Sequence, residues 1–182
     1  MSTKVALLGF GTVGKGTYNA LTTNAAEIER KTGKKVEVKK ILEINPKVIE
    51  SGYAPKELFT QDFDAILADP EIKIVAEIIG GMDLAKEFIL RALRAGKHVV
   101  TPNKAVIAAN FEELHKVAAE NGVQLRYEAS VGGAIPVIET IRKSLVANTI
   151  TKVEGIVNGT TNYILTKMEE DNISYADALK QA

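Results

Sequence analysis

The residue types and spacing near the start of the chain could bind phosphate. In LLGFGTVGKG, Leu7 to Gly16, three glycines fit the pattern G-x-G-x-x-G between an apolar run and a helical pattern. Gly9 would permit the tight turn, Gly11 would let backbone approach a pyrophosphate, and Gly14 would let a helix pack closely on a strand. We therefore predict a dinucleotide-binding turn at Gly9, Phe10, Gly11, Thr12, Val13 and Gly14.

The turn has two alternative interpretations. A glycine-rich turn selected only for packing would need no ligand, but strand and helix signals on both sides favour the dinucleotide interpretation. A P-loop is disfavoured, because Lys15 precedes Gly16 and Thr17 and no Gly-Lys-Ser/Thr order follows.

An acidic side chain at the end of the second predicted strand bears on the choice of cofactor. Glu43 stands 29 residues after Gly14 (43 minus 14), beyond the typical distance of about 20, and a long first helix accounts for the excess. A carboxylate there accepts hydrogen bonds from a ribose and repels a 2′-phosphate, which favours NAD. Lys47 leaves NADP open, and a solvated strand end is the plainer alternative for Glu43.

Further candidates follow the later predicted strands. The paired glycines Gly80 and Gly81 would let a ribose or nicotinamide lie against the backbone. The next strand ends in the candidate cofactor residues Thr101, Pro102, Asn103 and Lys104. Lys104 is either a surface charge or a group aimed into a cleft, and its place after a strand favours the cleft.

Apolar runs and helical patterns alternate along the chain and must position these residues. Expected strands cover Lys4–Leu8, Val36–Leu42, Ile72–Ile79, His98–Thr101, Val123–Glu128 and Ile150–Val157. Expected helices cover Thr12–Thr32, Asp62–Ala68, a segment through Leu84–Leu93, Phe111–Asn121, Ile135–Val146 and two segments ending at Ala182. This alternation predicts an α/β fold, a doubly wound parallel sheet of the Rossmann type, which binds ligands at the carboxyl ends of its strands.

Length and composition narrow the classes of partner. The 182 residues are 46% hydrophobic and 25% charged, with 23 basic and 23 acidic residues and no cysteine. We expect a dinucleotide-binding domain at residues 1–148 and the incomplete start of a second, α+β domain at residues 149–182. The charge balance predicts a small-molecule partner rather than nucleic acid or membrane, and the lack of cysteine is typical of the cytoplasm.

Five motifs, in their order and spacing, resemble the homoserine dehydrogenase family: GFGTVGKG, EIIGG, GKHVVTPNKA, YEASVGGAIP and GIVNGTTNYIL. The resemblance runs from Val5 to about Leu179, and the last three motifs are far more specific than the glycine pattern. It implies an NAD(P)-dependent oxidoreductase that interconverts L-homoserine and L-aspartate 4-semialdehyde in threonine and methionine biosynthesis. It also implies a homodimer at the family's full length.

The resemblance assigns roles residue by residue. Lys104 corresponds to the catalytic lysine beside the nicotinamide, where a cation favours the alkoxide-like oxygen of the reaction. Thr160 is expected at the substrate site with Asn158 and Gly159, although a threonine here could instead be a helix N-cap. The family's sodium loop would lie at Glu128, Val131, Gly133 and Ile135, for which a plain helix-entry turn is the alternative.

Some family features lie outside this sequence or differ in it. The family's second catalytic lysine and the carboxylates that hold the substrate amino group lie downstream of Ala182. We therefore expect the 182-residue chain to bind dinucleotide but to turn over homoserine poorly, which kinetics at a normal family level would refute. Ile44 replaces an arginine of many members, which again favours NAD. Two alternatives remain: a non-catalytic dinucleotide-binding module, and a related semialdehyde or sugar dehydrogenase.

Overall fold

The computed structural model describes residues 2–156 and 158–182, which divide into two compact units. The first unit extends to Ser130, and the second runs from Val131 to Ala182. The domain boundary expected after residue 148 stays a prediction.

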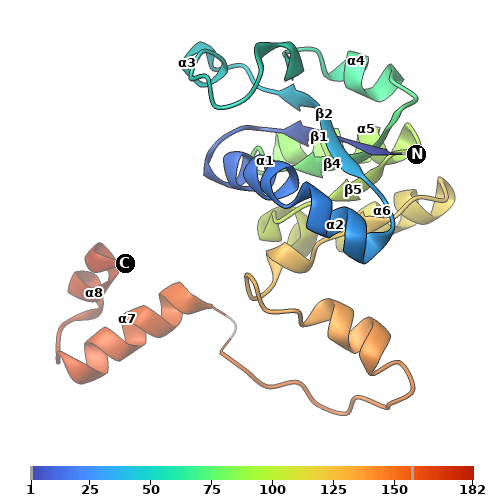
Figure 1. Ribbon diagram of the computed structural model, residues 1–182. Coiled ribbons are helices and arrows are strands. Elements are labelled where there is room, and N and C mark those ends of the chain that lie inside the picture. The colour runs from blue at the N-terminus through green and yellow to red at the C-terminus, as the bar shows by residue number, and fades with distance from the viewer. Residues whose placement is uncertain (1, 157) are drawn as a thin grey trace. The chain divides into compact units, whose positions relative to one another are not determined.

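Strands and helices alternate through the first unit (Figure 1). Its strands are β1 (Thr3–Leu8), β2 (Val36–Leu42), β3 (Phe59–Thr60), β4 (Ile72–Glu77), β5 (His98–Val100) and β6 (Leu125–Arg126). Its α-helices are α1 (Thr12–Thr23), α2 (Ala25–Thr32), α3 (Pro46–Ile49), α4 (Phe63–Ala68), α5 (Asp83–Arg94) and α6 (Lys104–Glu120). Two short 3₁₀ turns complete it, η1 (Lys56–Leu58) and η2 (Glu128–Ser130).

Within the described residues, the six strands form one sheet in the order β3-β2-β1-β4-β5-β6, and each neighbouring pair is parallel. The order changes direction at β1 and β4, the point where a doubly wound sheet opens a ligand-binding crevice. Because parallel strands need crossovers, a helix follows β1, β4 and β5 directly. The predicted Rossmann-type fold is confirmed.

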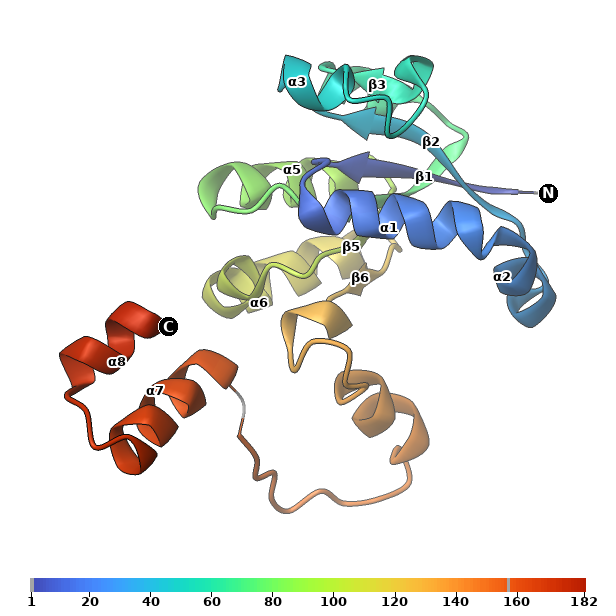
Figure 2. The ribbon, with the colours of Figure 1, turned by 60° about the vertical axis from the view of Figure 1, so that its left-hand side comes forward.

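The helices cover both faces of this sheet. Figures 1 and 2 show α1 and α2 on one face and α5 and α6 on the other. The apolar side chains of α5 are buried at Ala85, Ile89, Leu90, Ala92 and Leu93. Helix α4 packs beside α5, since the Phe63 and Phe88 rings stack with centroids 4.2 Å apart. The sheet is therefore a rigid, two-sided core that fixes where each strand ends.

The register of the strands brings their carboxyl ends level. Leu8 of β1 pairs with Leu42 of β2 on one side and with Glu77 of β4 on the other. Ala76 of β4 pairs with Val100 of β5, so the residues that follow, Glu77 and Thr101, are neighbours. The candidate residues after β1, β2, β4 and β5 consequently share one edge of the sheet.

The second unit is helical in the part that the structure describes. It contains a π-helical turn η3 (Thr140–Ser144) and the helices α7 (Gly159–Glu170) and α8 (Tyr175–Gln181). The expected helix Ile135–Val146 is thus wrong in extent, because Pro136 disfavours helical backbone at the residue before it. None of the helices among the described residues is long and apolar enough to cross a membrane.

The strand expected at Ile150–Val157 is wrong for residues 150–156, and Val157 lies outside the described residues. Residues 150–156 carry strand-like apolar side chains, but they remain 43% exposed at Ile150, 69% at Val153 and 78% at Ile156. A strand needs a neighbouring strand for its backbone hydrogen bonds, and none of the described strands pairs with this segment.

Two helices of the first unit also differ from expectation. The helix expected at Thr12–Thr32 is divided at Asn24, whose φ of −100° and ψ of 16° interrupt the helical backbone. Helix α6 is kinked at Asn110, whose φ is −133° and ψ 23°, so the helix expected from Phe111 corresponds to its second part. Its first part, from Lys104, was not expected, and the Asn103 side chain caps it by accepting a hydrogen bond from Val106 N at 3.2 Å. Lys104 therefore opens a helix directly after β5.

Candidate dinucleotide and substrate site

The three glycines of the first turn meet different surroundings. A Cβ on Gly9 would lie 2.9 Å from the Ile78 carbonyl oxygen, and Gly9 has a φ of +100°. A Cβ on Gly14 would lie 2.4 Å from the Gly9 carbonyl oxygen, whereas a Cβ on Gly11 would meet nothing within 4 Å. Gly9 and Gly14 are thus required by the protein itself, and Gly11 faces open space at the N-terminus of α1, where backbone N–H groups favour an anion.

Phe10 has a different part in this turn from its glycine neighbours. Its side chain is fully buried, and its ring meets those of Tyr18, Tyr53 and Phe59 edge-on at centroid distances of 5.7, 5.9 and 5.3 Å. Phe10 therefore anchors the turn in the core, and a cofactor contact from it would come from backbone. Thr12 and Val13 are exposed beside it.

Glu43 fastens the end of β2 to the glycine turn. Its Oε2 accepts a hydrogen bond from Phe10 N at 3.0 Å, and its Oε1 accepts from Ile44 N and Asn45 N, both at 2.9 Å. The simple alternative of a solvated strand end does not describe this half-buried carboxylate. These contacts place a negative charge beside the turn, as the argument for NAD requires, while Ile44 is 75% exposed.

The turns after β4 and β5 are joined by hydrogen bonds. Glu77 is fully buried and accepts from the Thr101 hydroxyl at 2.7 Å and from Ile79 N at 2.9 Å. Asn103 Nδ2 donates to the Gly81 carbonyl oxygen at 2.7 Å. Gly80 and Gly81 have φ values of +83° and +72°, which glycine adopts without strain. The sequence interpretation missed Glu77, although an acidic residue closing an apolar strand was a visible signal.

Lys104 is exposed as the first residue of α6, directly after the half-buried Pro102 and Asn103. The positive end of a helix dipole disfavours a cation, so packing and electrostatics do not account for a lysine here. Among the described residues, no carboxylate forms an ion pair with it. Its ammonium group is thus available at the same sheet edge as the glycine turn.

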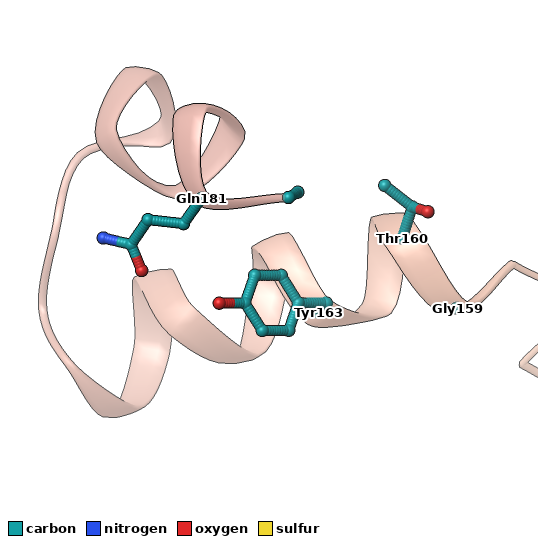
Figure 3. Close-up of a pocket in the computed structure, with 5 residues that line it drawn as sticks. Gly159, Thr160, Tyr163 and Gln181 are labelled. Carbon is teal, nitrogen blue, oxygen red and sulfur yellow. The ribbon is translucent and has the colours of Figure 1, made fainter.

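The predicted substrate residues lie at the start of α7 in the second unit. Asn158 is the N-cap, since its Oδ1 accepts a hydrogen bond from Thr161 N at 2.9 Å. Gly159 and Thr160 instead line an open pocket of about 360 Å³ together with Tyr163, Gln181 and Ala182 (Figure 3). Tyr163 was not singled out from the sequence, although its spacing of three residues from Thr160 places both on one helix face.

The residues proposed for a cation are divided between the units. Glu128 lies in η2 of the first unit, and Val131, Gly133 and Ile135 lie in the second. The Ile135 carbonyl oxygen accepts a hydrogen bond from Val137 N at 2.9 Å. The described residues contain no cluster of three or more His, Cys, Asp or Glu side chains suited to a metal ion. A sodium site here would rely on backbone oxygens, and it stays a prediction.

The sheet order and the glycine turn together define a Rossmann-type fold of the dinucleotide-binding class. Comparison with known families agrees: the family model described as "Homoserine dehydrogenase, NAD binding domain" matches residues 9–128, and the one described as "Homoserine dehydrogenase" matches residues 136–182. The chain belongs to the homoserine dehydrogenase family, as the five motifs predicted.

Relatives and solved structures support this assignment. The homoserine dehydrogenase of Pseudomonas aeruginosa is 46% identical over 98% of this chain and 41% of its own length, and that of Bacillus subtilis is 40% identical over the same shares. The structure of a homoserine dehydrogenase from Thiobacillus denitrificans is similar to this chain, with a TM-score of 0.89 and 39% sequence identity. The match covers all of this chain and 42% of that chain.

A hyperthermophilic archaeal homoserine dehydrogenase in complex with NADPH is also similar. It is 28% identical, and the match covers all of this chain and 60% of that one with a TM-score of 0.78. The chain spans about two fifths of the length of the curated relatives it matches.

Proposed function

We propose that this chain holds NAD(H) at the carboxyl edge of its sheet and supplies the cofactor half of homoserine and aspartate semialdehyde interconversion. The observation that carries the proposal is the glycine turn, in which Gly9 and Gly14 are sterically required and Gly11 alone faces open space. That combination leaves a backbone surface for a pyrophosphate at the N-terminus of α1. The other proposed cofactor contacts lie at Glu43, Gly80, Gly81, Pro102, Asn103 and Lys104, whereas Thr101 is fully buried and lies behind them.

The choice of NAD over NADP rests on Glu43 and Ile44. The carboxylate beside Phe10 N would repel a 2′-phosphate, and Ile44 offers no positive charge to attract one. A similar archaeal homoserine dehydrogenase is in complex with NADPH, so the proposed preference for NAD rests on these side chains and not on membership of the family.

Chemistry at this site is assigned to a few side chains. When bound, the nicotinamide ring accepts or supplies the hydride. The Lys104 ammonium stabilises negative charge on the reacting oxygen, and Thr160 and Gly159 contact the substrate, as the resemblance to the family implies. Asn158 acts chiefly by capping α7 and fixing Gly159 and Thr160.

Replacement of Lys104 tests this assignment in a form of the protein that spans the family's full length. Lys104→Ala should lower kcat for homoserine oxidation by about 10²- to 10³-fold, because one charge that stabilises the transition state is lost. NADH should still bind, because the other proposed cofactor contacts remain. Lys116→Ala removes a 75% exposed lysine from the same helix and serves as the control. Unchanged turnover in Lys104→Ala would remove Lys104 from the mechanism.

A further inference from the structure

Glu77 is a fully buried ionisable group to which the proposed function gives no role. Its exposed fraction is 0%, it ends β4, and it lies beside Thr101, which is also fully buried. Burying a carboxylate is costly unless hydrogen bonds satisfy its oxygens. Packing alone would be served better by an apolar residue of similar size, so this position calls for a specific explanation.

Four hydrogen bonds, two of them to Glu77, connect the turn that follows β4 with the segment that follows β5. Glu77 Oε1 accepts from Ile79 N at 2.9 Å, and Oε2 accepts from the Thr101 hydroxyl at 2.7 Å. The Thr101 oxygen accepts in turn from Asn103 N at 3.0 Å, and Asn103 Nδ2 donates to the Gly81 carbonyl oxygen at 2.7 Å. These bonds form a closed circuit that returns to the turn on which Ile79 lies.

The circuit constrains the flexible elements of the candidate site. Gly80 and Gly81 lack side chains that would restrict their backbone, so the bonds to Ile79 and Gly81 define where this turn lies. Asn103 also caps α6, which sets the backbone position of Lys104. The Thr101 hydroxyl donates to Glu77, so it has no proton left to donate to a cofactor.

We propose that Glu77 is a positioning residue, whose buried carboxylate holds the Gly80–Gly81 turn and the Thr101–Lys104 segment in the geometry that receives the dinucleotide. Two donors approach it, so it must present two acceptor oxygens. Glutamine would replace it poorly, because its amide NH₂ would face either Ile79 N–H or the Thr101 oxygen, and in the second case the Thr101 hydroxyl proton would lose its buried acceptor. This inference rests on the proposed dinucleotide binding.

The test measures the dissociation constants of NADH and NADPH for four variants. Binding is monitored by the fluorescence of the reduced nicotinamide, at temperatures well below the unfolding temperature of each variant. Glu77→Gln and Thr101→Val, which lacks the hydroxyl, should each bind at least about tenfold more weakly, the loss expected when a buried hydrogen bond is left unmade. Thr101→Ser keeps the hydroxyl and should bind like the wild type.

Lys97→Met is the matched control for a merely structural effect. Lys97 is 5% exposed just before β5, at the opposite edge of the sheet, and its Nζ donates to the carbonyl oxygens of Asp69 at 2.5 Å and Ile72 at 2.9 Å. Its replacement should lower thermal stability while leaving both dissociation constants unchanged.

The outcomes separate this inference from the function on which it rests. If the wild-type chain binds neither NADH nor NADPH, the proposed function fails and the inference fails with it. If the wild type binds but Glu77→Gln and Thr101→Val bind as well as Lys97→Met, only the positioning role is overturned. Should Glu77→Gln not fold, the comparison of Thr101→Val with Thr101→Ser decides, and equal loss in both variants contradicts the proposal.

Discussion

At the scale of single residues, identical glycines in one turn have distinct physical reasons to be glycine. Gly9 needs a positive φ and has Ile78 close behind it, Gly14 touches the Gly9 carbonyl, and Gly11 is restricted by nothing in the protein. The spacing of the pattern predicted the tight turn at Gly9 and the close packing at Gly14, and the phosphate contact of Gly11 stays a prediction. It could not predict that Phe10 would be a buried anchor, since the rings around it come from distant segments.

Alanine substitutions should separate these roles. Gly14→Ala should lower the free energy of unfolding by about 1–3 kcal/mol or more, because its Cβ collides with backbone. Gly11→Ala should fold with near wild-type stability and bind NADH at least about tenfold more weakly, because the methyl group would occupy the phosphate surface. Chemical denaturation and fluorescence titration measure the two effects.

Gly16→Ala is the control for Gly11→Ala. A Cβ on Gly16 also meets nothing within 4 Å, but Gly16 lies inside α1, away from the predicted phosphate turn. Alanine there should increase stability by about 0.5–1 kcal/mol and leave NADH affinity unchanged. Equal NADH affinity in Gly11→Ala, Gly14→Ala and Gly16→Ala would argue against a phosphate at this turn.

At the scale of elements, the sequence predicted strands and helices well where a residue next to the element marks its end. Strand β2 was predicted at both ends, as Val36–Leu42, since Gly33 ends α2 before it with a φ of +69°. The start of α6 was missed because it depends on the hydrogen bond that the Asn103 side chain accepts at the helix N-terminus. In the sequence, an asparagine that caps a helix looks the same as an asparagine in a loop. Residues 150–156 show a strand pattern without a partner strand among the described residues.

The β1–β2 pair carries a charge interaction with a pH-dependent consequence. Lys4 and Lys35 donate to Glu37 at 2.7 and 2.9 Å, and the hydrogen bond from Lys4, followed by that from Lys35, lowers the pKa of Glu37 from 4.5 to about 2. A carboxyl group with a lowered pKa stabilises the fold fully above its unfolded pKa, and this stabilisation is lost as the pH falls towards about 2.

Glu37→Gln should therefore reduce the loss of stability between the unfolded pKa of 4.5 and about pH 2. Urea denaturation of both proteins across this interval measures the difference, and the two curves should converge at the acid end. Glu112→Gln, which removes an exposed glutamate from α6, is the control. Parallel pH profiles for the wild type and Glu37→Gln would contradict the ion-pair account.

At the scale of the whole molecule, the family and the fold were both predictable from motifs that follow successive strands. The Rossmann order of the sheet explains why motifs far apart in sequence meet at one edge, and the matches to residues 9–128 and 136–182 cover both units. An acidic residue at the end of an apolar strand was visible at Glu77, but its role depends on its register beside Thr101, which a sequence pattern does not reveal. Lys104 and Thr160 belong to different units, so their joint action in catalysis stays a prediction.

The central claim, that the carboxyl edge of this sheet binds NAD(H), is tested most directly by titrating the 182-residue chain with NADH and NADPH in parallel. The account predicts saturable binding of NADH, with NADPH binding more weakly because the Glu43 carboxylate lies beside the glycine turn. Tighter binding of NADPH would contradict the role given to Glu43. Absence of binding by both dinucleotides would contradict the account as a whole.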